Sequence, residues 1–445
     1  MASTARWQRA PLDEDPAGES PAQETRAPGW DLLRVCVAVY VATAVGRVHE
    51  LFPILLPLKP ALLSAMLAMG LYLLQPSSRW RFGLLRSSTT TCVLWLAFWG
   101  ALTVPAALNR GLAFQSWTDF ARTIVMCLVV AASVRGTRDV ERLLLVYFGA
   151  VAVYTGVVLS RFQLGGGSNW RLDNLYTYDA NDLATLIATA MPLGLYFVVG
   201  QRRRPSLRWL AGAGLAVLAV GLIRSGSRGG FLAFLAVTAF VLVRVTTIPA
   251  RSRLAGLVVI LAVVFGTASD QYWSQMRTIV NPKQDYNMTS DAGRIQIWKR
   301  GIGYMLGQPV FGVGMKNFQV AEGTISPRAR LQERGVGVWW GAAHNSYVQA
   351  GAELGIPGVL FFIGMFATAF VSLRRAARQA LRVRPGGSEV SRLAQSLMAA
   401  LVGFTVGAFF LSLAYADMLY MLMGFTIALL KAVRLEAARE RALLA

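Results

Sequence analysis

Residues 344–372 read HNSYVQAGAELGIPGVLFFIGMFATAFVS, a histidine followed by a long apolar run. A helix needs about 20 apolar residues to cross the hydrocarbon core of a bilayer. The run from 345 to 372 meets that length, so it predicts a membrane-spanning helix with a histidine at its entrance. The whole chain has the same character, because 55% of its 445 residues are hydrophobic, 15% are charged and the mean hydropathy is +0.47. These values predict a polytopic membrane protein and exclude a single soluble core.

The apolar runs predict an all-α fold of about 12 transmembrane helices. The predicted spans lie near 31–46, 58–75, 90–108, 118–134, 141–160, 181–200, 208–223, 229–247, 253–269, 345–372, 393–412 and 415–431. One long segment, residues 270–343, separates the ninth span from the tenth. The predicted plan is therefore a helical bundle with one large loop on one side of the membrane.

The net charge of +21 is concentrated in short arginine clusters between apolar runs. In a soluble protein such a charge would suggest a nucleic-acid partner, but loops that alternate between basic and weakly charged follow the positive-inside rule. This pattern predicts membrane lipids and no nucleic acid as partners. It places both termini and the basic loops in the cytoplasm, and residues 270–343 on the outer face.

The predicted organisation has five parts. Residues 1–30 lack the apolar core of a signal peptide and are expected to form a disordered cytoplasmic tail. Transmembrane helices 1–9 occupy residues 31–269, and helices 10–12 occupy residues 344–431. Residues 270–343 form the outer loop, and residues 432–445 form a basic cytoplasmic tail.

The outer loop and the cysteines carry further local signals. Residues 291–307 have apolar positions at helical spacing with Asp291 as a candidate N-cap, and the Pro- and Gly-containing residues 308–318 predict a turn. Cys36, Cys92 and Cys127 lie in or beside apolar runs without CxxC spacing. They are expected to be packing residues and not part of a zinc site or a disulfide framework.

His344 is the first candidate for chemistry, since it lies where the outer loop re-enters the membrane. A neutral imidazole there can act as a general base near neutral pH. The alternative is an interfacial histidine that donates to a backbone carbonyl. Asn345 is expected to cap the following helix, with Tyr347 lining the site. The other histidine, His49, lies in a short outer loop without a special pattern and is expected to have no such role.

Arginines on the outer face form the second set of candidates. Arg224 and Arg228 lie in a turn, RSGSRGG, whose small residues and following helix N-terminus suit a phosphate or diphosphate. Snorkelling of these arginines to lipid headgroups is the alternative. Arg294 and Trp298 lie on the outer helix, where Trp298 is either a site residue or a membrane anchor.

Two further groups are weaker candidates. Arg171 and Asn181 lie near the outer start of the sixth span, where Asp179 through Asp182 are expected to act mainly as helix caps. Asp417 lies near the outer turn between the last two spans, and an isolated carboxylate there is either functional or paired with an arginine. No nucleotide-phosphate loop, HExxH, GxSxG or DxD-type metal pair is present on the outer face, so neither a metal nor another cofactor is predicted.

Three motifs carry a family resemblance. In order and spacing, SGSRGGFLAFLAV, GRIQIWKRGIGYMLGQPVFGVGMKNF and HNSYVQAGAELGIPGVLFF resemble the O-antigen ligase and O-antigen polymerase superfamily over about residues 225–365. The resemblance implies a GT-C-type helical fold in the bacterial inner membrane, with the active site facing the periplasm. It implies inverting glycan transfer from undecaprenyl diphosphate without metal or ATP.

The resemblance also assigns roles to individual residues. It makes His344 the general base and Arg228 and Arg294 the diphosphate-binding arginines. Arg171 and Asn181 become secondary candidates, through the similarity of YDANDLA to a segment in many members. Asn345, Tyr347, Trp298, Arg224 and Asp417 remain substrate-binding candidates.

Lipid A-core is the favoured acceptor, and the product would be lipopolysaccharide. A polymerase that extends lipid-linked chains and a ligase acting on protein or exopolysaccharide remain as alternatives within the superfamily. A polytopic transporter is the alternative from another class, but transporters usually keep charged residues near the membrane midplane. The clustering of polar candidates at the outer end favours a transferase.

Overall fold

The computed structural model describes residues 30–75, 83–164, 170–172, 178–200, 204–281, 287, 290, 293–330, 341–383 and 387–444. These residues form helices and connecting turns, with no β-strand among them. Two predictions fall outside the described residues: the tail up to residue 29 and the candidate cap Asp291.

A helix occupies each of the predicted spans, so the all-helical fold class is confirmed. These helices are α1 (Leu32–Ala44), α2 (Pro60–Leu73), α4 (Ser88–Thr103), α5 (Arg110–Ser133), α6 (Thr137–Leu164), α7 (Ala180–Val199), α8 (Pro205–Ser225), α9 (Arg228–Arg244), α10 (Ala250–Thr267), α16 (Ser346–Val383), α17 (Gly387–Gly407) and α18 (Asp417–Leu444). Residues 270–343, the predicted outer loop, contain α11 (Asp270–Arg277), α13 (Arg294–Gly307), α14 (Phe318–Thr324) and α15 (Pro327–Arg330). Short 3-10 turns are η2 (Val48–Leu51), η3 (Pro53–Leu55), η4 (Val104–Ala106) and η6 (Ala408–Phe410).

Nine helices in the described part of the chain are long and apolar enough to cross a membrane. The count is below the predicted twelve because α1, α2 and α9 have 13, 14 and 17 residues. The first two are short because the chain turns sharply beside them, with left-handed backbone at Arg47 after α1 and at Lys59 before α2. At the other extreme, α18 continues to Leu444, past the predicted boundary at residue 431.

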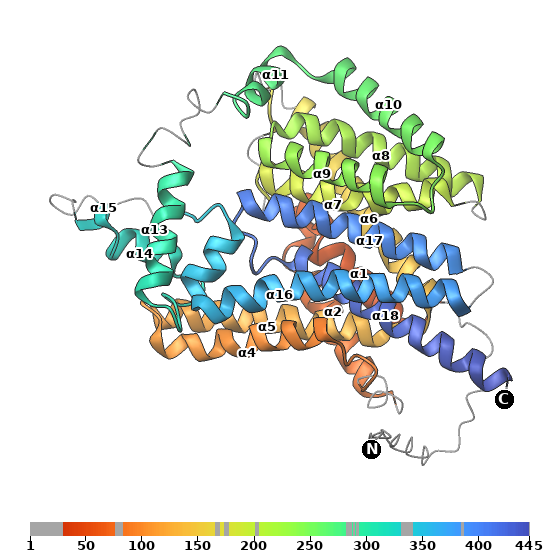
Figure 1. Ribbon diagram of the computed structural model, residues 1–445, viewed down its shortest axis with the longest axis horizontal. Coiled ribbons are helices and arrows are strands. Elements are labelled where there is room, and N and C mark those ends of the chain that lie inside the picture. The colour runs from red at the N-terminus through yellow and green to blue at the C-terminus, as the bar shows by residue number, and fades with distance from the viewer. Residues whose placement is uncertain are drawn as a thin grey trace, which may run out of the picture.

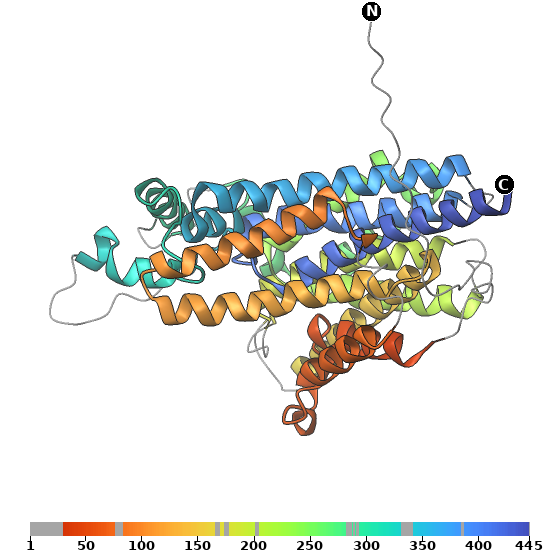
Figure 2. The same cartoon turned by 90° about the horizontal axis from the view of Figure 1, so that it is seen from below.

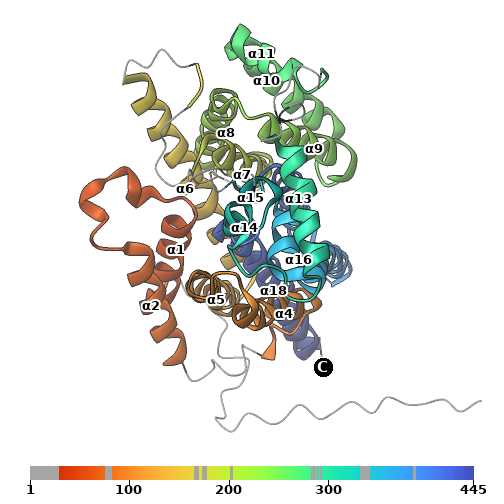
Figure 3. The same ribbon diagram turned by 90° about the vertical axis from the view of Figure 1, so that its left-hand side faces the viewer.

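The long helices run roughly parallel, with α13, α14 and α15 at one end of the bundle and the C-terminus at the other (Figure 1). Helix α18 is almost wholly buried and packs against α5, α6, α16 and α17. Helices α1 and α2 form one edge, seen below the bundle in Figure 2. In the end-on view α10 and α11 lie at a separate edge (Figure 3), where α10 packs on α8 and α9.

Helix α16 is broken where the sequence predicts a continuous span. Gly355 has a left-handed φ of 71°, and a Cβ built on it would lie 2.3 Å from the Val310 carbonyl oxygen. Pro357 follows within the same helix. Backbone groups freed at the break need partners inside a membrane protein. The turn after α13 supplies them, since Val313 N donates to Ala352 O at 2.8 Å and Ile356 N donates to Pro309 O at 2.8 Å.

The outer helices are joined by a buried ion pair. Arg300 on α13 contacts Glu322 on α14 with both Nε and Nη2, the shorter distance being 2.7 Å. Tyr304 donates its hydroxyl to the same carboxylate at 2.7 Å. The predicted turn at 308–318 is confirmed. The predicted helix is present as α13, but it begins at Arg294, so the residue at its N-cap is Gly293 and not Asp291. Helices α13–α15 form a packed layer at one end of the bundle, called the outer layer after its predicted location.

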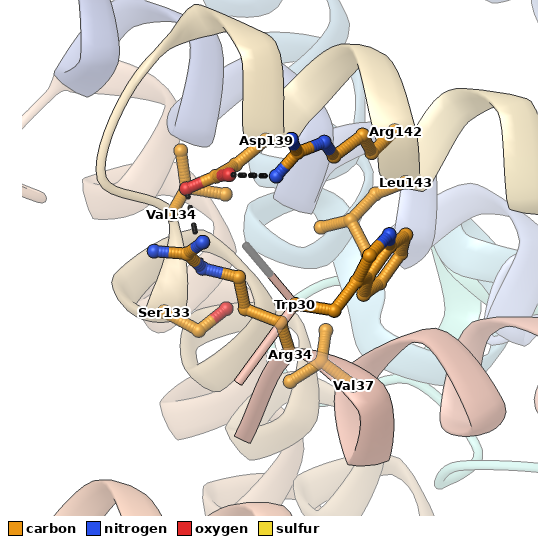
Figure 4. A pocket seen from close by; sticks show the side chains of 8 residues that line it. All are labelled: Trp30, Arg34, Val37, Ser133, Val134, Asp139, Arg142 and Leu143. Carbon is orange, nitrogen blue, oxygen red and sulfur yellow. Dashed lines mark ion pairs between the residues drawn. The ribbon is translucent and has the colours of Figure 1, made fainter. Parts of the chain in front are cut away.

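The opposite end of the bundle has its own polar contacts. Lys431 of α18 has no exposed surface and donates to the carbonyl oxygens of Ala132 and Val134, at the end of α5. In a neighbouring pocket, Asp139 bridges Arg34 at 3.4 Å and Arg142 at 3.6 Å (Figure 4). These contacts join α1, α5, α6 and α18 far along the bundle from α13–α15.

The three cysteines are free, and Cys36 and Cys127 are buried while Cys92 is half-buried. Their predicted role in packing is confirmed by this placement.

Candidate active site

His344 occupies a strained turn between residues 341–343 and α16. Its backbone φ of 47° is left-handed, which costs an L-residue about 1–2 kcal/mol. The His344 amide donates to Ser412 Oγ at 2.9 Å. Trp298 Nε1 donates to the carbonyl oxygen of Ala343 at 3.0 Å. The turn is thus held from two directions, by α13 and by the segment between η6 and α18.

Asn345 fixes the start of α16. Its Oδ1 accepts from the backbone amides of Tyr347 at 2.9 Å and Val348 at 3.1 Å, as an N-cap side chain does. Asn345 is buried, and the following Ser346 donates to Leu411 O at 2.7 Å. The cap predicted from the sequence is therefore present.

The charges around His344 act on its imidazole in opposite directions. Burial lowers the pKa of His344 below 6.5, and Arg294 lowers it further, whereas Asp179 raises it. The net direction is downward. The fold thus brings Arg294 from α13 and Asp179 from the start of α7 close enough to influence one imidazole. A histidine with a lowered pKa is neutral at neutral pH and can accept a proton.

Arg294 is the first residue of α13 and follows the N-cap Gly293, which forms no side-chain cap. Trp298 lies four residues later, which places it on the same face of the helix as Arg294. The hydrogen bond from Trp298 to Ala343 O therefore sets where the N-terminal end of α13, with Arg294, lies relative to His344. The Trp298 ring also packs edge-on against Phe409, with ring centroids 5.2 Å apart.

The predicted RSGSRGG turn connects α8 to α9. Gly226 ends α8 with a left-handed φ of 57°, and Ser227 caps α9 by accepting from Gly230 N at 3.1 Å. Arg228 begins α9 and donates to Thr278 Oγ1 at 2.7 Å, while the Arg224 carbonyl accepts from Leu172 N at 2.8 Å. The turn predicted from the sequence is therefore present, and the Arg228 side chain at its end is held by Thr278.

Arg171 and Asn181 lie together beside this turn. Arg171 donates to Ser225 O at 2.8 Å and to Asn181 Oδ1 at 3.1 Å. Asp179 caps α7 as expected, accepting from the backbone amides of Asn181 and Asp182 at 2.7 Å. The segment before α7 is thus joined to the end of α8.

The short helix η6 links these groups. A Cβ on Gly229 would lie 2.9 Å from Phe410 Cβ, so the start of α9 packs directly against η6. Phe409, the preceding residue, packs against Trp298. Three segments that are far apart in sequence, those of Arg228, Arg294 and His344, therefore all pack around η6 and the residues that follow it.

Comparison with known protein families gives a match for the middle of the chain. Residues 213–363 match the family model for O-antigen ligase. The matched region, residues 213–363, is similar to O-antigen ligases and is called the O-antigen ligase domain below. The resemblance predicted over about residues 225–365 is confirmed by this match, which also supports a function of the O-antigen ligase or polymerase type. No curated protein matches the chain.

The O-antigen ligase domain contains Arg224, Arg228, Arg294, Trp298 and His344 together with the first residues of α16. Arg171 and Asn181 precede it, and Asp417 follows it. Within the domain, Tyr347 donates its hydroxyl to Thr405 O at 2.9 Å, and its ring lies 5.6 Å from that of Phe362.

Asp417 lies outside the O-antigen ligase domain, in a polar cluster with Thr123 and Arg47. It begins α18, accepts from Thr123 Oγ1 at 2.7 Å and lies 3.8 Å from Arg47 Nη2. Arg47 also pairs with Glu50 at 2.8 Å and lies over the Tyr178 ring at 5.5 Å. Asp417 is therefore paired with an arginine, which the sequence analysis gave as the alternative to a functional carboxylate.

Two residues near His344 were not among the predicted site residues. Ser412 lies in a short connection with no local pattern, so only the tertiary contact reveals it. Asp179 is recognisable in the sequence as a helix cap, but its proximity to His344 depends on how α7 and α16 are placed.

Among the residues that the structure describes, no cluster of three or more His, Cys, Asp or Glu side chains is placed to hold a metal ion.

Proposed function

We propose that the protein transfers a glycan from undecaprenyl diphosphate to an acceptor hydroxyl of lipid A-core. The proposal is carried by one observation. The O-antigen ligase domain contains both Arg294 and His344, and the fold places them close enough for the guanidinium to lower the pKa of the imidazole. A neutral base beside a fixed positive charge suits the attack of a hydroxyl on a sugar diphosphate.

In the proposed reaction His344 takes the proton of the acceptor hydroxyl as its oxygen bonds to the anomeric carbon. The bond between that carbon and the diphosphate oxygen breaks at the same time. Its electron pair leaves with undecaprenyl diphosphate, and the attack from the opposite face inverts the anomeric centre. Arg294 and Arg228 stabilise the negative charge that develops on the departing diphosphate. No metal or nucleotide takes part in this proposal.

Arg224, Arg171 and Asn181 are proposed to support the diphosphate site. Arg171 is fixed by Ser225 O and Asn181 Oδ1, so its remaining donors have a defined direction. A guanidinium held by its own neighbours is preorganised for an anion, because less side-chain freedom is lost on binding.

The arrangement of the basic residues supports placing this site on the periplasmic face of the bacterial inner membrane. The C-terminal parts of α16 and α18 lie at the end opposite α13–α15 (Figure 1). They carry Arg374, Arg375, Arg378, Arg439 and Arg441. Positively charged segments are retained in the cytoplasm, so the end with His344 would face outward.

The test is a reaction of the purified full-length protein with an undecaprenyl-diphosphate-linked glycan, with and without lipid A-core, in the presence of EDTA. The readouts are the released undecaprenyl diphosphate and the lipid that carries the glycan. We expect glycan on lipid A-core, lost in His344→Ala. His49→Ala, which removes the other histidine, is the matched control and should retain transfer.

Other products would redirect the assignment. Longer glycans that remain on undecaprenyl diphosphate would make the protein a polymerase, and glycan on protein or exopolysaccharide would change the acceptor. Transfer by His344→Ala at the rate of the unmodified protein would remove His344 from the mechanism. Solute flux through protein in liposomes, without release of lipid diphosphate, would favour a transporter.

A further inference from the structure

His344 is one of four non-glycine residues with positive φ in the described part of the chain, beside Arg47, Lys59 and Lys316. Such a conformation persists only where the surrounding structure holds it, and it is often found at functional sites. The φ of His344 fixes where its Cα–Cβ bond points, and rotation about the side-chain bonds then decides where the imidazole lies. The contacts that hold this φ therefore set the point from which the imidazole extends.

The bond from the His344 amide reaches Ser412, in the connection between η6 and α18. Ser412 lies between two residues that are themselves fixed. Ser346 Oγ donates to Leu411 O at 2.7 Å and accepts from Leu413 N at 2.8 Å. The backbone at Ser412 is thus held on both sides, and its hydroxyl is presented to the His344 amide at a defined position.

The connection has further supports that do not involve the Ser412 hydroxyl. Ala414 N donates to Gln349 Oε1 at 3.3 Å, and Tyr420 donates its hydroxyl to Ala414 O at 2.8 Å. Loss of the Ser412 hydroxyl should therefore leave the connection in place and remove only the acceptor of the His344 amide. This separation makes the side chain of Ser412 testable without unfolding the segment that carries it.

We propose that Ser412 is a positioning residue that fixes the imidazole of His344 for proton transfer. The inference rests on the proposed function, in which His344 is the base. Without the Ser412 acceptor, the His344 amide loses its partner and the turn can relax toward a less strained φ. The imidazole then moves relative to Arg294 and to the acceptor hydroxyl, and small displacements of a catalytic group reduce rate strongly.

The experiment compares purified Ser412→Ala, Ser412→Cys and Ser412→Thr with the unmodified protein in the glycan-transfer reaction. Ser412→Ala removes the acceptor, Ser412→Cys keeps the size but offers a weak acceptor, and Ser412→Thr keeps the hydroxyl. We expect kcat to fall about tenfold in the first two with KM changed less than about twofold, and Ser412→Thr to recover most of the rate. The pH profile of the Ser412→Ala and Ser412→Cys variants should also shift, because the distance from the imidazole to Arg294 changes.

Controls separate positioning from folding. Ser396→Ala removes a hydroxyl that bonds only to Arg392 O within its own helix, and it should leave kcat unchanged. Thermal unfolding and size exclusion give the folded fraction of every variant. If Ser412→Ala fails to fold, the result for Ser412→Cys decides. A folded Ser412→Cys with the kcat and pH profile of the unmodified protein would overturn the inference.

The parallel result for His344→Ala shows which proposal fails. If His344→Ala is inactive while folded Ser412 variants are fully active, the positioning role is wrong and the proposed function stands. If His344→Ala is fully active, the proposed function fails and the positioning role fails with it.

Discussion

At the scale of single residues, the chemistry of the candidate site is set by opposing charges around His344. Burial and Arg294 both favour the neutral imidazole, while Asp179 favours the charged form. The balance leaves the pKa of His344 below its usual value. A base of this kind remains available in mildly acidic conditions, where an ordinary histidine would already be protonated.

The first prediction concerns pH dependence. The acidic limb of kcat/KM should lie below pH 6.5, because the His344 pKa is lowered and activity is lost only as pH falls through that pKa. Asp179→Asn removes the charge that raises the pKa, so the limb should move to lower pH. Asparagine also caps helices well, so α7 should keep its start.

Arg294→Met should shift the acidic limb of kcat/KM in the opposite direction. It removes a charge that lowers the pKa of His344, so the limb should move to higher pH, and transfer should also slow because Arg294 is proposed to bind the diphosphate. The measurement is kcat/KM against pH for both variants. Limbs that stay in place, or that move in the same direction, would contradict the placement of these charges around the imidazole.

At the scale of elements, the break in α16 connects the bundle to the outer layer. Helix α16 opens at Gly355, and the turn after α13 bonds to the freed backbone groups. Trp99 Nε1 of α4 donates to Leu354 O at 2.9 Å, so a third element also bonds to the backbone at the break. The outer helices are thus attached by main-chain hydrogen bonds as well as by side-chain packing.

The second prediction is that Gly355→Ala destabilises the protein by about 2–4 kcal/mol and detaches the outer layer. A Cβ there would meet the Val310 carbonyl oxygen at 2.3 Å and would also strain the left-handed backbone. Gly149→Ala in α6 is the control, because a Cβ at Gly149 meets nothing within 4 Å. Thermal unfolding and limited proteolysis between α13 and α15 measure both effects. Equal stability of the two variants would refute this account of the break.

The third prediction concerns the contact between α18 and α5. Lys431→Met keeps the length of the side chain but leaves the carbonyl oxygens of Ala132 and Val134 without that donor. We expect a loss of about 1–3 kcal/mol in the free energy of unfolding. Arg441→Met, which changes an exposed residue of the same helix, should have an effect below about 0.5 kcal/mol. Denaturant titration in detergent compares the two, and an unchanged midpoint for Lys431→Met would be the contrary result.

At the scale of the whole molecule, polar functions are divided between the two ends of the bundle. The O-antigen ligase domain includes α13, which lies with α14 and α15 at one end of the bundle (Figure 1). Helix α13 begins at Arg294, and its Trp298 bonds to Ala343, the residue before His344. The opposite end carries the arginine-rich parts of α16 and α18. This division is expected of a protein that meets a lipid-linked substrate on one side of a membrane and is anchored by positive charge on the other.

The fourth prediction tests that division. In a variant without the three native cysteines, Ile302→Cys on α13 and Arg375→Cys on α16 place single thiols at exposed positions. A membrane-impermeant maleimide applied to intact spheroplasts should label Ile302→Cys and should label Arg375→Cys only after permeabilisation. The reverse pattern would place His344 on the cytoplasmic side and contradict the proposed topology.

The sequence alone determined the helical fold class, the position of each long helix and the O-antigen ligase resemblance, because bilayer thickness and local capping act over a few tens of consecutive residues. It also identified Asn345 and Asp179 as caps, since capping depends on neighbours within one turn. The shortness of α1 and α2 and the break at Gly355 were not predicted, because they depend on contacts between elements. The resemblance had already assigned Arg294 to the site of His344, but the tertiary structure alone placed Asp179 and Ser412 beside it. Those contacts join segments tens to more than a hundred residues apart, and no local pattern encodes the packing of α7, α13 and η6 that brings them together.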